Sequence, residues 1–187
     1  MFLFRRACDL LLAPTATWST IATETSDART LYTTYLLPLA ALPALASWIG
    51  LCVVGFSSAG EAVRLSPLAG LINALLGYVL SLLTIFILAR FANRLASNFS
   101  GQPDPAAALR LIGYSSTPAL LGGIFAVVPH WAGLGLVPTL YAAFVLARGI
   151  PVLMRSNPER TLSYTTILMI GTLALGTING AILAALR

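Results

Sequence analysis

The chain has 187 residues, of which 58% are hydrophobic and only 9% charged, and its mean hydropathy is +0.87. A soluble domain needs far more charge on its surface, so this composition excludes a soluble protein and predicts a membrane protein. The formal net charge is +5, and all eleven basic residues are Arg. They fall at the ends of apolar runs rather than on one soluble face, which argues against a nucleic-acid partner.

The first 29 residues are too polar to span a bilayer. Pro14 suits the first turn of a helix. The residues that recur after it at helical spacing are Trp18, Ile21, Ala22 and Thr25. We therefore expect a short interfacial amphipathic helix on the inner surface of the membrane, with Trp18 at headgroup level.

Four uncharged runs follow and predict the membrane spans. They cover residues 30–60, 65–89, 111–147 and 161–186. A spanning helix needs about 20 mostly apolar residues, so the third run is long enough for two spans joined by a turn at 129–133. The sequence thus predicts an all-α membrane protein, with a cytoplasmic or interfacial segment, 1–29, and a five-span transmembrane helical bundle, 30–187. The approximate spans are 32–55, 67–89, 108–128, 132–154 and 162–185.

Arginine is distributed unevenly between the two sides of this predicted bundle. The side that carries the N-terminus has nine: Arg5, Arg6, Arg29, Arg90, Arg94, Arg110, Arg148, Arg155 and Arg160. The other side has only Arg64 and Arg187. Because cytoplasmic loops carry the excess of basic residues, the N-terminus is expected in the cytoplasm and the C-terminus outside.

The third span contains a proline where a helix should continue. Pro118 has no N–H, so the carbonyl of Tyr114 loses its helical partner and must be satisfied by another group. Ser115, Ser116 and Thr117 supply hydroxyls within one turn. Two interpretations stay open: a packing kink whose hydroxyls cap freed backbone groups, or a polar site or hinge of the kind that transporters use.

The second span carries a possible partner for this candidate polar site. If it runs inward from Pro67, then Tyr78, Ser81 and Thr84 fall at a similar depth to Pro118. A hydroxyl-lined path between the two spans would suit a small transporter, a channel or a lipid scramblase.

Two amides and a row of small residues are candidates for helix packing. Asn73 and Asn179 lie near the outer ends of spans two and five, where they could hydrogen-bond across the bundle or simply join helices. Span five also has small residues at four-residue spacing, which allow close helix approach inside the bundle or in a dimer. These are Thr172, Gly176, Gly180 and Ala184.

The position of Arg148 depends on where span four ends. If the span ends near Ala147, Arg148 is an interfacial anchor whose charge reaches the headgroups. If the helix continues to Met154, the charge lies within the membrane and needs a partner, for which Glu24 and Glu159 are the nearest candidates.

The sequence offers no catalytic, cofactor or metal site. His130 stands alone in the turn between spans three and four, without nearby acidic or Cys ligands. No predicted span contains an acidic residue, and no HExxH motif occurs. We therefore expect neither an enzyme nor a bound cofactor.

Four stretches carry a family resemblance. They are "PTATWSTIATE" (14–24), "LLPLAALPALASWIG" (36–50), "YSSTPALLGGI" (114–124) and "GIPVLMRSNPERTLSYT" (149–165). In this order they resemble the Yip family (Ypt/Rab-interacting proteins), in its compact bacterial branch. The positions that match its motifs are Trp18, Glu24, Pro38, Tyr114, Ser115, Thr117, Pro118, Gly149, Pro151 and Tyr164.

The resemblance implies a five-span helical protein with a cytoplasmic N-terminus, and no catalytic role for these positions. Eukaryotic relatives contact prenylated Rab GTPases, but the N-terminal segment is short here and bacteria lack that machinery, so this role is not carried over. We expect a non-enzymatic, multi-pass protein of the bacterial inner membrane that binds lipids or a membrane partner, with a homo-oligomer possible, and organises the bilayer. A transporter, channel or scramblase is the alternative.

Overall fold

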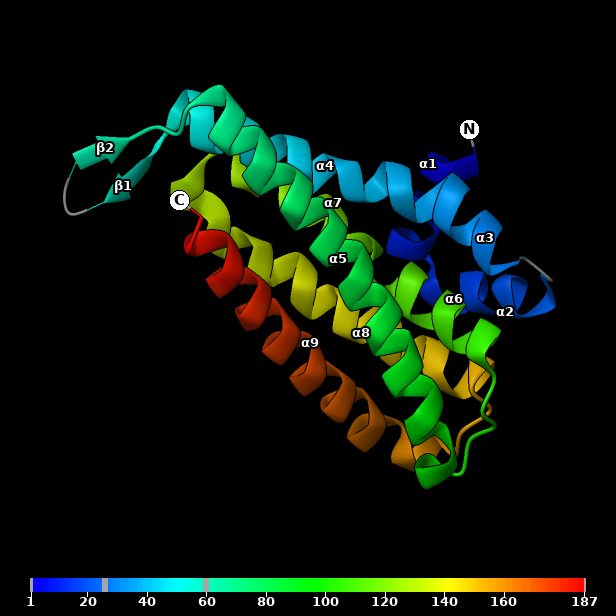
Figure 1. Ribbon diagram of the computed structural model, residues 1–187. Coiled ribbons are helices and arrows are strands. Elements are labelled where there is room, and N and C mark those ends of the chain that lie inside the picture. The colour runs from blue at the N-terminus through cyan, green and yellow to red at the C-terminus, as the bar shows by residue number, and fades with distance from the viewer. Residues whose placement is uncertain (1, 25–26, 59–60, 187) are drawn as a thin grey trace.

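The computed structural model describes residues 2–24, 27–58 and 61–186, which form an elongated helical bundle (Figure 1). Its α-helices are α1 (Phe2–Leu12), α2 (Pro14–Thr23), α3 (Ala28–Leu31), α4 (Leu37–Ile49), α5 (Pro67–Leu95), α6 (Pro105–Ser115), α7 (Thr117–Gly122), α8 (Leu136–Leu153) and α9 (Thr161–Ala184). Turns of π-helix flank α4 at Tyr32–Leu36 and Gly50–Val54. Turns of 3₁₀-helix lie at Ala96–Phe99, Gly123–Val127, Pro129–Gly135 and Pro158–Arg160.

Four helical stretches of the described residues are long and apolar enough to cross a membrane. They are Ala28–Val54, Pro67–Phe99, Pro129–Leu153 and Pro158–Ala184. These stretches coincide with the first, second, fourth and fifth spans expected from the sequence. Large apolar side chains such as Leu68, Leu140 and Leu162 point outward from them, which suits a surface facing lipid tails rather than water.

The segment expected as the third span is built differently. Helix α6 begins at an N-cap, because Asp104 accepts hydrogen bonds from the backbone N–H groups of Ala106 (2.9 Å) and Ala107 (3.1 Å). It ends at Ser115, and α7 begins two residues later, directly before Pro118. Since α6 alone rises only about 16 Å, it is too short to cross a bilayer unaided.

A short β-hairpin joins α4 and α5, which the expectation of an all-α chain misses. Strands β1 (Phe56–Ser58) and β2 (Glu61–Val63) pair in antiparallel register, with Phe56 opposite Val63. The hairpin extends from one end of the bundle in Figure 1. Each strand has only three residues, too few to show an alternating pattern in the sequence.

The N-terminal segment forms two helices, and α2 begins at Pro14 as the sequence indicates. Helix α2 packs against α8. Trp18, which is expected at headgroup level, has its side chain completely buried in the protein rather than exposed on the helix surface. Ile21 is buried beside it, Ala22 is exposed, and Thr25 lies outside the described residues.

Candidate functional site

The hydroxyls around the helix break satisfy the backbone locally. Thr117 donates from Oγ1 to the carbonyl of Tyr114 (2.7 Å), the group that Pro118 leaves without its helical partner. Ser115 donates to the carbonyl of Leu111 (2.6 Å), and Ser116 in the same way to that of Ile112. All three hydroxyls therefore use their protons on the helix that carries them.

An aromatic cluster occupies one side of the break. The hydroxyls of Tyr35 and Thr117 share a hydrogen bond of 2.7 Å, and both side chains are completely buried. The ring of Tyr114 meets that of Tyr35 edge-on, with the centroids 4.9 Å apart, and meets Trp18 at 6.5 Å. The cluster therefore joins α2, the start of the first span and the broken helix.

Trp18 is held in this cluster by α8. Its indole N–H donates to the carbonyl of Val145 (2.9 Å). The ring lies directly on Gly149, where an added Cβ would come within 2.6 Å of both Trp18 Cε2 and Leu111 Cδ1. Gly149 is thus required here for close packing, so the positions matching the motifs at Trp18, Tyr114 and Gly149 meet in space.

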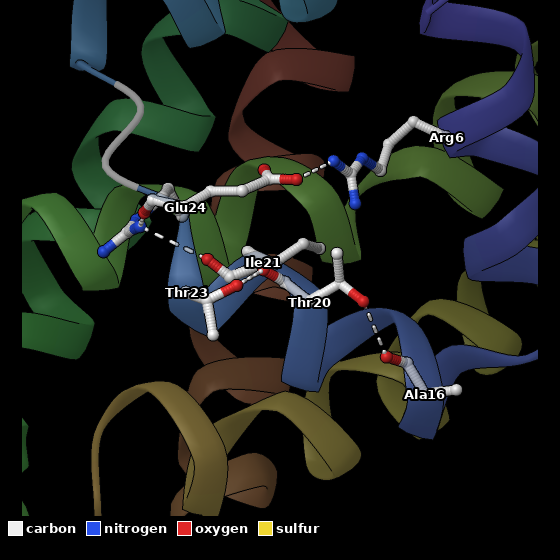
Figure 2. A network of polar contacts seen from close by, with 7 residues as sticks. Arg6, Ala16, Thr20, Ile21, Thr23 and Glu24 are labelled. Atoms are coloured by element: carbon white, nitrogen blue, oxygen red, sulfur yellow. Dashed lines mark hydrogen bonds and ion pairs between the residues drawn. The ribbon is translucent and has the colours of Figure 1, made fainter.

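A polar network closes the cluster at one edge, beside α1 and α2 (Figure 2). The Glu24 carboxylate forms an ion pair with Arg6, whose side chain is buried. Arg110 donates to the main-chain carbonyls of Glu24 and of Ile21, the latter at 3.3 Å. The Arg6 guanidinium also lies 5.8 Å from the centroid of the Tyr114 ring, a cation–π contact.

A cavity of about 220 Å³ lies on the other side of the break, partly open to the surface. Its lining comes from α5 to α9 and is mostly apolar. The polar members of the lining are Ser81, Thr84, Ser115, Ser116, Thr139, Thr172 and Asn179. Three residues that the sequence groups together, Ser81, Thr84 and Ser115, therefore do meet.

The remaining members of that predicted group lie elsewhere. Tyr114, Thr117 and Pro118 do not line the cavity, and two of them belong to the aromatic cluster. The Tyr78 hydroxyl donates to the carbonyl of Leu37 (3.1 Å) and so joins α5 to α4 instead. The residues of the candidate polar site therefore lie in two separate environments.

The two amides of the predicted spans each form a hydrogen bond between α5 and α9, but they do not bond to each other. Asn73 donates to the carbonyl of Leu183 (2.8 Å), while Asn179 donates to Oγ1 of Thr84 (2.8 Å). Gly176 and Gly180 on the same face of α9 are exposed, and a Cβ at either would meet nothing within 4 Å.

Three other positions that match the family motifs lie within helices: Tyr164, Pro38 and Pro151. The Tyr164 hydroxyl donates to the carbonyl of Ala92, and its ring stacks on Phe99 with the centroids 4.7 Å apart. Pro38 lies in the first turn of α4, and Pro151 lies inside α8.

Arg148 lies within α8, which continues to Leu153, and its side chain is exposed. Its guanidinium lies 5.1 Å from the centroid of the Phe144 ring. Of the two acids suggested by topology, Glu24 is engaged by Arg6.

Sequence reasoning missed Arg6 and Tyr35 as members of the cluster. Arg6 was counted only as a topology signal, and Tyr35 lies in an apolar run with nothing to mark it. Among the residues that the structure describes, no three His, Cys, Asp or Glu side chains gather in a group that could hold a metal ion.

Comparison with known proteins places these features in a family. The Yip1 domain matches residues 8–178. The inner membrane protein YohC of Escherichia coli strain K12 is 32% identical over 159 residues, which cover 83% of this chain and 80% of that protein; YohC of strain O6:H1 gives the same values. No solved structure matches the chain. The chain is a multi-pass inner-membrane protein, and it belongs to the Yip1 domain family.

Proposed function

We propose that this protein is a non-enzymatic lipid-binding protein, and that the cavity between α5 and α9 takes an acyl chain of a membrane phospholipid. The observation that carries the proposal is the cavity itself, which is mostly apolar and partly open. Helices α5, α8 and α9, which belong to stretches long and apolar enough to span a bilayer, form it together with the short α6 and α7. An acyl chain is the apolar molecule that surrounds such helices, so it is the occupant best suited to this lining.

We further propose that the chain crosses the membrane five times, with α6, α7 and the following 3₁₀ turn as a broken third crossing. Two features support this topology. Helix α1 and the last turns of α9 lie at opposite ends of the bundle in Figure 1, as an odd number of crossings requires. The backbone at the break is buried in protein, the condition under which an irregular segment is tolerated at membrane depth.

The same topology would put nine arginines on the cytoplasmic side, where anionic headgroups would be held close to the protein. An acyl-chain site inside the bundle, together with this basic face, would organise the lipids around the protein. A solute pathway is less well supported, because five cavity hydroxyls, those of Ser81, Ser115, Ser116, Thr139 and Thr172, donate to their own helix. They leave few donors for a polar solute.

Gly176→Leu tests the acyl-chain site. Gly176 lines the cavity, and a Cβ added there would meet no atom within 4 Å, so leucine has room to extend into part of the cavity. Gly180→Leu is the matched control, because it adds the same side chain one turn away, also into open space, on a residue outside the cavity lining. Both changes replace a glycine by a better helix former.

The measurement is native mass spectrometry of the full chain released gently from its membrane, counting phospholipid retained per protein. The wild type and Gly180→Leu should retain phospholipid, and Gly176→Leu should lose most of it. Equal retention by the two variants would contradict the proposal. Solute flux into liposomes that Gly176→Leu blocks, without any retained lipid, would favour the transporter alternative.

A further inference from the structure

A second pocket, of about 450 Å³, lies at the end of the bundle where α6 begins and α8 ends. Unlike the intramembrane cavity, it is lined largely by polar groups. Its polar side chains are Gln102, Asp104, Arg110 and Arg155. Helix α2, the loop before α6, helix α6 itself and the end of α8 with the residues after it each contribute to the lining, so the pocket depends on the folded arrangement of segments far apart in the sequence.

Arg155 is held at this pocket in a backbone conformation that is unfavourable for arginine. Its φ of 49° is left-handed, at the position after the α8 C-cap where glycine is usual. Any residue with a Cβ pays about 1–2 kcal/mol for this conformation. The guanidinium donates to Oε1 of Gln102 (3.0 Å). The main-chain N–H of Gln102 in turn donates to the carbonyl of Met154 (2.8 Å). An energetically unfavourable backbone conformation therefore places a charged, exposed side chain at the pocket. This combination is typical of functional positions.

Arg110 supplies a second guanidinium with a donor to spare. One of its terminal nitrogens donates to the main-chain carbonyls of Ile21 and Glu24. Its Nε is buried and has no hydrogen-bond partner among the described residues. The side chain is therefore fixed in place. Because the buried Nε is out of a ligand's reach, the donor left for a ligand is the other terminal nitrogen, which makes no hydrogen bond among the described residues.

The charge of the lining favours an anion. Two arginines face one carboxylate, that of Asp104, and Oδ1 of this carboxylate is occupied by the N–H groups of Ala106 and Ala107. The Glu24 carboxylate is paired with Arg6 instead. The lining therefore keeps a net positive charge, because its two arginines outnumber its one carboxylate.

We propose that this pocket binds a phosphate group between Arg110 and Arg155. Guanidinium groups match the geometry of phosphate oxygens and bind them with paired, charge-assisted hydrogen bonds. The phosphate belongs either to a phospholipid headgroup or to a small soluble phosphate, since both present the same oxygens. This site does not depend on the acyl-chain cavity, whose lining shares no residue with it.

Arg155→Gly is the principal test, because glycine removes the guanidinium and relieves the left-handed backbone at once. Asp104→Asn is its counterpart: asparagine caps a helix as well as aspartate does, but removes the negative charge from the pocket. Arg160→Gln is the control, since Arg160 is exposed, donates to the carbonyl of Asn98 and does not line the pocket. Thermal unfolding of each purified full-length variant should be unchanged or, for Arg155→Gly, raised.

The binding measurement uses the full chain in neutral detergent, titrated with phosphatidylglycerol, phosphatidylcholine or inorganic phosphate, with bound species counted by native mass spectrometry. The wild type should bind at least one of the two anions in preference to phosphatidylcholine. Arg155→Gly should weaken that binding by about tenfold, and Asp104→Asn should strengthen it several-fold. Inorganic phosphate that displaces phosphatidylglycerol would identify soluble phosphate as a ligand, whereas phosphatidylglycerol binding that phosphate leaves unchanged would identify the lipid headgroup. Equal anion binding by Arg155→Gly, Arg160→Gln and the wild type would overturn the proposal.

Discussion

Ser115 and Thr117 are only two residues apart, yet they face different parts of the molecule. Thr117 is completely buried and bonded to Tyr35 and to the freed carbonyl of Tyr114, within the aromatic cluster. Ser115 lines the partly open cavity on the other side. Residues two positions apart in a helix are separated by about 200° around its axis, so the broken helix presents its hydroxyls in opposite directions.

The two sides differ in how completely they are filled. On the cluster side, the rings of Trp18 and Tyr35 both pack against Tyr114, and the polar atoms of Trp18 and Tyr35 have hydrogen-bond partners. On the cavity side, space of about 220 Å³ is left open beside Thr84 and Ser115. A helix break can therefore serve structure and site at once: the tightly packed face holds the break in place, and the opposite face is left free for a ligand.

The largest effect on stability is expected from removing a buried ring of the aromatic cluster. Trp18→Ala removes a fully buried ring and its hydrogen bond to Val145, so the free energy of unfolding should fall by about 3–5 kcal/mol. Trp131→Ala is the control, because that ring is exposed, and it should change stability by less than about 0.5 kcal/mol. Reversible unfolding in mixed micelles gives both values. A small effect of Trp18→Ala would mean that the cluster does not hold the break.

A smaller loss is expected from the ion pair that closes the cluster. Glu24→Gln removes the charge that faces the buried Arg6 guanidinium, which should cost about 2 kcal/mol of unfolding free energy. Glu159→Gln removes an exposed acid that forms no ion pair with any residue that the structure describes, and should be close to neutral. Equal stability of the two variants would show that the pairing of Glu24 is incidental. Lipid retention in the cavity should be the same in both, since neither residue lines it.

Much of the bundle could be predicted from the sequence because long apolar runs are a strong signal. The runs located four spanning stretches. The Asp104–Pro105 pair is likewise a local signal typical of a helix start, and α6 begins there. Pro118 pointed to the break because a missing N–H acts on its own helix. These are local effects, so they can be read from neighbouring residues alone.

The environments of single side chains could not be predicted in the same way. The helical spacing around Trp18 fits a helix on the membrane surface as well as a helix buried against α8. Periodicity shows that one face of a helix is apolar, but it does not show whether lipid or protein covers that face. Arg6 looked like a topology signal, yet it is paired inside the protein. Tyr78 shares a helix with Ser81 and Thr84 but points toward α4, a direction that depends on how the helices are packed.

The smallest expected change in unfolding free energy compares the two faces of the broken helix directly. Thr117→Val keeps the shape of the side chain but removes its hydroxyl. The carbonyl of Tyr114 and the hydroxyl of Tyr35 each lose a hydrogen-bond partner, so the free energy of unfolding should fall by about 1–2 kcal/mol. Ser115→Ala removes a hydroxyl that only bonds back to Leu111 in its own helix, and should change stability by less than about 0.5 kcal/mol.

Lipid retention should be unchanged by either substitution if the cavity binds an acyl chain, because an apolar chain needs no hydroxyl from Ser115. Unfolding in mixed micelles and native mass spectrometry on the same preparations measure both quantities. If Ser115→Ala abolished a transport activity or lipid retention while leaving stability intact, the hydroxyl would be a ligand-binding group and the cavity a polar site. If Thr117→Val left stability intact, the aromatic cluster would not be the face that holds the break, and the division of roles between the two faces would be wrong.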